Sequence, residues 1–291
     1  MLGISSVMLS VLETEFRVKT QTLSCALVQS NSGSDVSKNL EFIFQALNKA
    51  SQGAAKLIIF PEVCLCRKQH RDDTLKLFDL DGPEISKIAQ EAKRLAIWVL
   101  LGSVSERISE SRKAYNSQIL INPEGEIAAV YRKIHLFNVE VDGKKIWESV
   151  LFKAGEKPLI VDIEGFQVGL SICYDLRFPE LYRYYASQGA EVLLVPASFT
   201  ATTGEAHWEL LLRARAVENQ CYVLAPNQVG VGAQGVKTYG NSLAVDPWGR
   251  CMMRGSEDKT GIFFVELKKE ILKDIREKLP VLKHRRSELF I

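Results

Sequence analysis

Three residues that could act together in nucleophilic catalysis stand where predicted buried strands end: Glu62, Lys133 and Cys173. A cysteine attacks carbon as its thiolate, so a catalytic thiol needs a base or a cation beside it. In α/β sheets, ligands bind outside the carboxyl ends of the strands. Separations of 71 and 40 residues exclude a local cluster, so only the fold can bring these side chains together. The pattern predicts a thiol-dependent site at the strand ends.

Each of the three residues also has an ordinary structural explanation. A glutamate after a strand is usually a solvated loop charge, and Lys133 belongs to the basic pair Arg132-Lys133. A cysteine in an apolar run is most often an inert buried thiol. The hypothesis of a catalytic site therefore rests on the combination of the three positions.

An alternation of strands and helices supplies the elements that must position these residues. Short apolar runs predict strands, and apolar residues recurring every three to four positions predict helices. The predicted strands cover residues 23–29, 57–60, 97–104, 116–121, 127–131, 166–172, 192–195, 221–225, 242–245, 251–253 and 261–266, and the predicted helices cover 36–50, 82–95, 179–188, 205–219 and a charged segment up to 278. We interpret residues 1–21 as an N-terminal extension and residues 22–291 as one α/β domain with mixed sheets.

Composition and charge exclude several classes of protein. The 37 basic and 35 acidic residues leave a net charge of +2, which gives no reason to expect nucleic acid or an anionic membrane as a partner. No apolar stretch reaches the roughly 18 to 20 residues of a membrane span. The first twelve residues are apolar but lack the basic start and the cleavage site of a signal peptide.

The use of cysteine and histidine indicates neither a metal site nor a disulfide framework. The six cysteines are scattered, four of them in or beside apolar strand-like runs, and the four histidines form no ligand cluster. Reduced thiols of this kind suit a cytosolic protein. We therefore expect no cofactor, no metal and a cytoplasmic location, with mitochondria as an alternative if the source is a eukaryote.

Three segments resemble, in order and in spacing, the signature segments of the nitrilase superfamily: Phe60-Pro61-Glu62, the run from Arg132 to Phe137, and the run from Cys173 to Glu180. The resemblance extends from about residue 24 to residue 290 and is closest to the Nit branch, which includes deaminated glutathione amidase and omega-amidase. Residues 220–223 and the ending His284-Arg285-Arg286 favour the former. The resemblance implies a four-layer αββα sandwich with mixed β-sheets, and a homodimer or larger homo-oligomer.

The same resemblance implies a role for each polar residue. Glu62 is expected to be the general base and Cys173 the nucleophile that forms a thioester. Lys133 and the backbone N–H of Tyr174 are expected to stabilise the oxyanion, as preorganised donors do in acyl transfer. A second glutamate that orients the lysine and the substrate maps to Glu148.

The choice of substrate is expected to depend on pocket residues within segments 199–204 and 227–239. Among individual residues, Phe199 and His207 are predicted to contact the substrate. Arg177 and Glu180 are predicted to brace the turn after the nucleophile and not to touch the substrate.

Three hypotheses for function are open at this point. The first is an amidase that releases ammonia from the terminal amide of a small 2-oxo acid, with deaminated glutathione favoured over 2-oxoglutaramate. The second is another reaction of the superfamily, on N-carbamoyl acids, nitriles or other linear amides. The third is a non-catalytic interaction scaffold, against which the filled positions 62, 133 and 173 argue.

Overall fold

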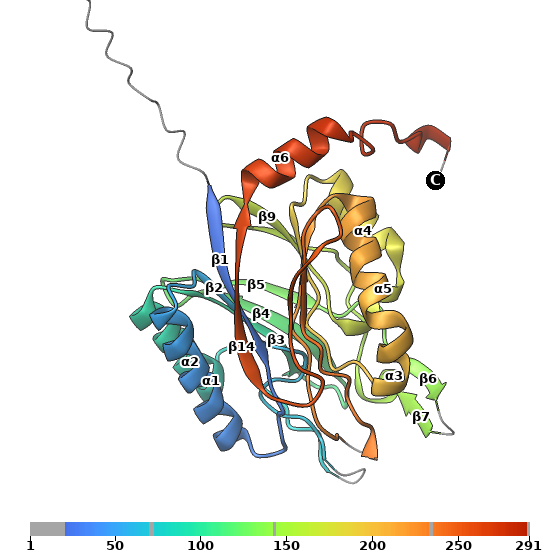
Figure 1. The fold of residues 1–291 in the computed structure, drawn as a ribbon. Helices are drawn as coiled ribbons and strands as arrows, with labels where there is room; N and C mark the ends of the chain where they lie inside the picture. Colours follow the sequence, from blue (N-terminus) through green and yellow to red (C-terminus); the bar gives the residue numbers. More distant parts are fainter. Residues whose placement is uncertain (1–20, 70–72, 142–143, 233–234, 290–291) are drawn as a thin grey trace, which may run out of the picture.

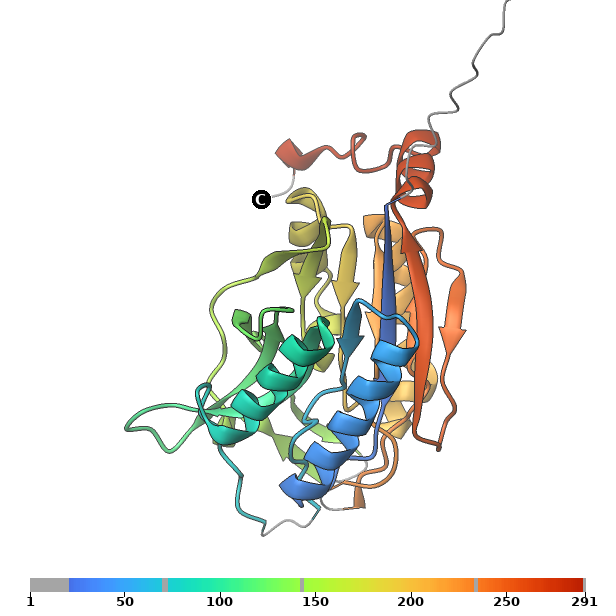
Figure 2. The ribbon, with the colours of Figure 1, turned by 90° about the vertical axis from the view of Figure 1, so that its left-hand side faces the viewer.

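The structure is a computed structural model that describes residues 21–69, 73–141, 144–232 and 235–289. Within these residues two six-stranded mixed sheets face each other, and helices cover the outer side of each sheet (Figures 1 and 2). The layers therefore follow the order helix, sheet, sheet, helix, which confirms the predicted αββα sandwich. The predicted N-terminal extension lies outside the described residues except for Gln21.

Each sheet contains three neighbouring parallel strands flanked by antiparallel ones. The first sheet contains, in spatial order, β14 (Gly261–Lys268), β1 (Thr22–Gln29), β2 (Leu57–Ile59), β3 (Trp98–Arg107), β4 (Ala114–Ile121) and β5 (Ile127–Arg132). The second contains β13 (Cys251–Arg254), β12 (Leu243–Val245), β11 (Tyr222–Ala225), β10 (Val192–Leu194), β9 (Phe166–Leu170) and β8 (Ile160–Ile163). Strands β1 to β3 and strands β9 to β11 are parallel, and their other neighbours are antiparallel.

The helices divide between the two outer faces. Helices α1 (Val36–Gln52) and α2 (Pro83–Leu95) cover the first sheet, and α4 (Pro179–Ser187) and α5 (Ala201–Asn219) cover the second (Figure 1). Helix α6 (Lys269–Lys278) follows β14 at the end of the sandwich. Among the residues described, no helix combines the length and the hydropathy needed to cross a bilayer.

Three hydrophobic cores fill the spaces between the four layers. In β1, Leu23 and Leu27 belong to the core between the two sheets, whereas Ala26 and Val28 face α1 and α2. Strand β11 alternates in the same way between the inner core and the core under α4 and α5. Because side chains alternate across a strand, an apolar residue at every position is what a strand buried on both faces requires. The continuous apolar runs therefore determine the sandwich.

All predicted helices and strands are present, but the structure also contains elements that were not predicted, among them the short helices Glu148–Leu151 and Cys173–Arg177. The hairpin β6 (Asn138–Val141) with β7 (Lys144–Trp147) and the strand β8 were not predicted, because β6 and β7 pair only with each other and have no continuous apolar run. Helix α5 begins at Ala201 and not at residue 205. Its first turn contains threonines and Gly204, which disfavour helices, but Gly204 packs against Tyr239 so closely that a Cβ would lie 2.3 Å from the ring.

Candidate active site

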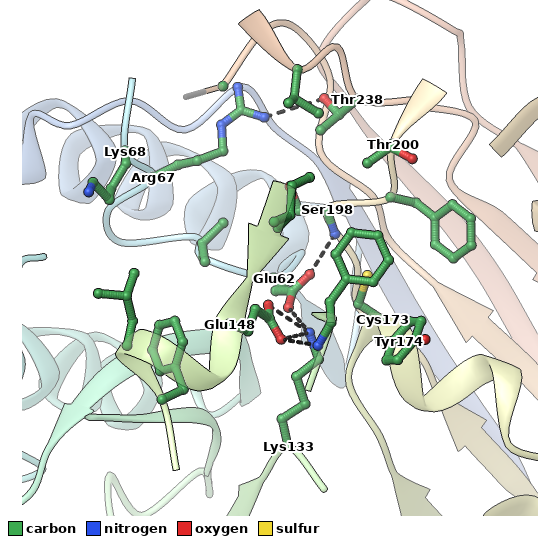
Figure 3. A pocket seen from close by; sticks show the side chains of 18 of the residues that line it. Glu62, Arg67, Lys68, Lys133, Glu148, Cys173, Tyr174, Ser198, Thr200 and Thr238 are labelled. Atoms are coloured by element: carbon green, nitrogen blue, oxygen red, sulfur yellow. Dashed lines mark hydrogen bonds and ion pairs between the residues drawn. The ribbon is translucent and has the colours of Figure 1, made fainter. Parts of the chain in front are cut away.

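Three strand ends bring Glu62, Lys133 and Cys173 to one site. Glu62 lies three residues after β2, Lys133 directly follows β5, and Cys173 lies three residues after β9. Strand β5 is antiparallel to β4, and β4 is antiparallel to β3, so β5 and β2 end at the same edge of the first sheet. Figure 3 shows the three side chains gathered in one pocket. The expectation that the fold would assemble them is confirmed.

The Lys133 ammonium lies between two carboxylates and its side chain is 1% exposed. Its Nζ is 3.0 Å from Glu62 Oε1 and 2.9 Å from Glu148 Oε2. Burial by itself favours the neutral amine, but the charges of Glu148 and Glu62 outweigh burial and raise the pKa of Lys133 well above its usual value. Lys133 therefore carries a positive charge throughout the neutral pH range.

The Glu62 carboxylate accepts three hydrogen bonds in a buried position. Its Oε1 accepts from Asn116 Nδ2 at 2.9 Å and from Lys133 Nζ at 3.0 Å. Its Oε2 accepts from the backbone N–H of Ser198 at 2.9 Å. An ionised carboxylate offers about four lone-pair sites, so roughly one remains for a proton from a thiol or a water molecule in the pocket. The arrangement fixes the orientation of the Glu62 carboxylate, as a general base requires.

Glu148 begins the short helix α3 (Glu148–Leu151), directly after β7. The backbone N–H of Phe137 donates to its Oε2 at 2.8 Å, while its Oε1 lies 3.0 Å from Lys133 Nζ. Burial raises the pKa of Glu148, and Lys133 opposes that rise. The hairpin of β6 and β7 therefore carries a second carboxylate to the lysine.

Cys173 stands on a sharp turn at the start of the 3₁₀ helix η1 (Cys173–Arg177). Its φ of +46° lies in the left-handed region, which costs a residue with a side chain about 1–2 kcal/mol. Its backbone N–H donates to Pro196 O at 3.0 Å, which ties the turn to the end of β10. Strain of this kind persists only where the surrounding structure holds the backbone.

The buried carboxylate of Asp175 supplies that support. Its Oδ2 accepts from the backbone N–H of Ile172 at 2.9 Å and from the Tyr131 hydroxyl at 2.7 Å. Its Oδ1 accepts from the backbone N–H of His135 at 3.0 Å and lies 2.7 Å from His135 Nδ1. Tyr131 and His135 flank Lys133, so one carboxylate connects the turn of the nucleophile to the strand of the lysine.

The ionisation of Cys173 is governed by opposing influences. Burial raises the pKa of the Cys173 thiol well above its usual value, and the Glu62 carboxylate raises it further. Lys133 and the backbone N–H of Ser198 act in the opposite direction without cancelling the rise. The resting thiol is therefore protonated at neutral pH and needs a base at the moment of attack.

A cavity of about 260 Å³, enough for a small molecule, opens above these side chains. Residues 198–200 and 203 line one part of its wall, and Gly232, Val236 and Thr238 line another, which confirms the expected position of the selecting segments. Tyr174, which directly follows Cys173 in the chain, also lines the cavity, and so does Phe199. The cavity thus has its reactive groups at the base and residues of the two expected pocket segments at the wall.

Arg177 lines the cavity, a position that the expectation of a residue bracing the turn after Cys173 did not include. Its guanidinium lies 5.2 Å from the Phe199 ring centroid and 5.8 Å from that of Tyr174. The part of the chain that the structure describes contains no carboxylate in an ion pair with it. Arg177 therefore presents a positive charge that can bind an anionic group of a ligand.

His207 does not line the cavity, which corrects the prediction that it contacts the substrate. It is exposed on the outer face of α5, while the next residue, Trp208, takes the buried position against Phe199. Successive residues of a helix point about 100° apart, so only one of the two can face inward. The Nδ1 of His207 is 3.2 Å from Arg177 Nη1, and its influence on a ligand passes through that arginine.

Sequence reasoning did not identify Asn116, Asp175, Ser198 or Arg67 as residues of the site. Asp175 lies inside the recognised segment beginning at Cys173, and Asn116 begins a run of three polar residues in a predicted strand, so both carried a signal. Ser198 contributes its backbone N–H, which no side-chain pattern reveals. Arg67 follows Glu62 by five residues and lines the cavity, but its spacing alone resembles an ordinary loop charge.

The thiols other than Cys173 and the residues of metal-binding type show no second reactive centre among the described residues. All six cysteines are free, and burial raises the pKa of both Cys64 and Cys221 to about 12. Within the ranges described, no three residues of the types His, Cys, Asp and Glu are grouped to hold a metal ion. The chemistry that this site supports is that of a thiol, a carboxylate and an ammonium group.

Comparisons with known proteins agree with this geometry. The family described as carbon-nitrogen hydrolase matches residues 24–277. Deaminated glutathione amidase from Synechocystis is 39% identical over 265 residues, which cover 89% of this chain and 97% of that protein. The Drosophila melanogaster nitrilase and fragile histidine triad fusion protein NitFhit is 37% identical over 94% of this chain, which spans 59% of that longer protein. The crystal structure of Caenorhabditis elegans NitFhit matches with a TM-score of 0.86 at 35% identity, over 94% of this chain and 67% of that one.

Proposed function

Since this chain belongs to the carbon-nitrogen hydrolase family, whose enzymes act on C–N bonds, we propose that it hydrolyses the amide of deaminated glutathione. The observation that carries this proposal is the cavity in which Glu62, Lys133 and Cys173 meet. The Arg177 guanidinium lines the same cavity, with no carboxylate of the described residues in an ion pair with it. The choice of substrate follows the relatives that are named deaminated glutathione amidase. The scaffold hypothesis is not pursued, because the reactive groups and the family both indicate a hydrolase.

The first half of the reaction forms a thioester. Glu62 takes the proton of the Cys173 thiol as Sγ attacks the amide carbon, because the thiol is protonated at rest. Negative charge develops on the amide oxygen, and Lys133 with the backbone N–H of Tyr174 stabilises it, a kind of contribution that is typically worth about 10² to 10³ in rate. Glu62 then gives its proton to the departing nitrogen, and the C–N bond breaks.

The second half releases the acid. A water molecule gives a proton to Glu62 and attacks the thioester carbon, and the same donors stabilise the second oxyanion. The C–S bond breaks, and the proton on Glu62 returns to Cys173 Sγ. The permanent charge of Lys133, maintained by Glu148, serves both halves without any change of protonation.

Arg177 is the residue that would bind the free carboxylate in the acyl part of the substrate. A guanidinium binds a carboxylate through two parallel charge-assisted hydrogen bonds. A 2-oxo dicarboxylic acid that forms an amide at one end keeps a free carboxylate at the other, which suits a cation in the wall beside Tyr174 and Phe199. Neutral nitriles and simple amides lack this group.

The leaving group distinguishes the candidate substrates. Ammonia leaves only from a primary amide such as 2-oxoglutaramate. In deaminated glutathione the nitrogen of the amide carries cysteinylglycine, so the dipeptide amine leaves and no ammonia is formed. The expectation of ammonia release therefore applies to 2-oxoglutaramate and not to the favoured substrate, whereas 2-oxoglutarate is the acid product of both.

The test measures 2-oxoglutarate formation from deaminated glutathione and from 2-oxoglutaramate, with an N-carbamoyl amino acid assayed for ammonia in parallel. We expect kcat/KM for deaminated glutathione to be at least about tenfold higher than for either alternative, a discrimination that one binding pocket can supply. The C173A variant should show no turnover. A preference for the carbamoyl compound, or full turnover by C173A, would overturn the proposal.

We also propose that a second copy of this chain is a partner. Five apolar side chains on α4, α5, β13 and the turn before β13 are exposed: Tyr184, Leu210, Val217, Trp248 and Met252. Leu210 and Val217 are seven residues apart and therefore share one face of α5. Exposed apolar patches of this kind favour association with another protein surface.

A further inference from the structure

Arg67 is a buried cation that has no acidic partner within the described part of the chain. It is 6% exposed, and no carboxylate among the described residues forms an ion pair with it. Arg215 is 5% exposed, but its guanidinium lies 2.9 Å from Glu218 Oε1. A buried charge is costly unless it is paired or coordinated, so an uncompensated guanidinium in a cavity wall requires an explanation.

The neutral hydrogen bonds of Arg67 hold the guanidinium in place without neutralising it. Its Nε donates to Ser32 O at 3.0 Å, its Nη1 to Thr238 Oγ1 at 3.3 Å, and its Nη2 to Asn31 Oδ1. Nη2 also reaches the carbonyl of Val229 at 3.1 Å. A guanidinium has five N–H donors, and the second N–H of Nη1 has no acceptor among the residues described. Burial lowers the pKa of Arg67 to about 10, so the group remains charged at neutral pH.

The position of Arg67 indicates which part of a substrate it would meet. Glu62 must protonate the departing nitrogen, so the leaving group lies on the side of Glu62. Arg67 follows Glu62 along the same segment, and both residues line the cavity. In Figure 3, Arg67 and Thr238 lie beyond Glu62 and Ser198, on the side away from Tyr174. Arg177 stacks near Tyr174, so the two guanidiniums lie toward different ends of the cavity.

We propose that Arg67 is a specificity-determining residue that binds a carboxylate at the far end of the leaving group. The preferred substrate then carries one carboxylate in its acyl part, toward Arg177, and a second one in its amine part, toward Arg67. This inference rests on the proposed function. It adds a requirement for charge in the leaving group, which the chemistry of the thioester does not need.

The first test uses the unaltered protein and two substrates that differ in one group. One is deaminated glutathione, and the other is the same compound with its glycine carboxylate converted to the carboxamide. We expect kcat/KM for the acid to be about 10- to 100-fold higher than for the carboxamide, as expected for loss of a charge-assisted hydrogen bond. Equal values for the two compounds would overturn the inference.

The second test compares that ratio among variants. R67Q should bring the ratio of kcat/KM for the acid to kcat/KM for the carboxamide close to one. R67K should retain part of the preference for the acid, because the charge remains without the fork of donors. R177Q should lower kcat/KM for both compounds and leave the ratio unchanged. R94Q, which removes an exposed arginine paired with Glu91 on α2, is the control for a change of charge alone.

A purely structural role for Arg67 would lower both rates together, since its hydrogen bonds join Ser32 to Val229 and Thr238. An R67Q ratio equal to that of the unaltered protein would therefore contradict the inference. If R67Q does not fold by circular dichroism, the comparison of the two substrates on the unaltered protein decides the question. If the unaltered protein hydrolyses neither compound, the proposed function fails, and the inference fails with it.

Discussion

At the scale of single residues, Cys173 lies between a carboxylate that opposes its ionisation and an ammonium that favours it. Burial and Glu62 prevail, so the thiol keeps its proton until the substrate arrives. This distinguishes the site from one with a standing thiolate, in which the attack itself would need no base. The charge of Lys133 is then free to act on the oxyanion.

The Glu62→Gln variant tests this assignment, because it should have opposite effects on ionisation and on turnover. Loss of the negative charge lowers the pKa of Cys173, so iodoacetamide should label this cysteine faster at a fixed pH near 8. Turnover should fall about 10²- to 10⁴-fold, because the general base is lost. Labelling is followed by mass spectrometry across a pH series, with the exposed Glu124→Gln as control. Slower labelling in E62Q would indicate that Glu62 already holds the proton at rest.

At the scale of elements, the approach of β3 to the end of β2 fixes the position of Glu62. Gly102 on β3 lies so close that a Cβ there would be 2.1 Å from Phe60 O and 2.4 Å from Pro61 O. These are backbone atoms and cannot rotate away. Val63, directly after the base, has a φ of +55°, and its N–H donates to Ser103 Oγ at 2.9 Å.

The Gly102→Ala variant should therefore displace the segment that carries Glu62. We expect kcat/KM to fall about 10²-fold, since a shift of about 1 Å at a catalytic group has that effect. The free energy of unfolding in urea should fall by about 1–3 kcal/mol, the usual cost of overpacking. Gly33→Ala is the matched control, because the nearest atom to its added Cβ is 4.0 Å away. Unchanged kinetics in G102A would show that the base tolerates movement.

At the scale of the whole molecule, the two sheets contribute different parts of the site. The first sheet supplies Glu62 and Lys133 from β2 and β5, and the second supplies Cys173 from β9. Asp175 joins the two through Tyr131 on β5. The catalytic groups therefore depend on the packing of one sheet against the other.

The exposed apolar face of α5 leads to a prediction about assembly. Leu210 is 67% exposed, and L210D should convert a dimer into a monomer because it places a charge in the proposed contact. Size-exclusion chromatography with light scattering measures the mass directly. The I127D variant, on β5 away from this face, should leave the mass unchanged. A monomeric unaltered protein would refute the proposed dimer.

The sequence by itself determined the residue types of the candidate site and most of the elements. Continuous apolar runs predicted strands buried on both faces, and the two sheets with three cores confirm that interpretation. The recognised segments at Glu62, Lys133 and Cys173 also predicted the family, which the comparisons confirm. The hydrophobic period of an element and the residue order within each recognised segment are local features, because each depends only on neighbouring residues.

Only the tertiary structure decided which further residues reach the site. Arg177 faces the cavity while His207 points outward, and neither direction follows from the spacing of the motif. Arg67 resembles a loop charge in sequence. Its burial, with no acidic partner among the described residues, appears only when the segments of Asn31 and Val229 close around it. Such properties depend on distances between segments that lie far apart in the chain, and those distances are set by packing.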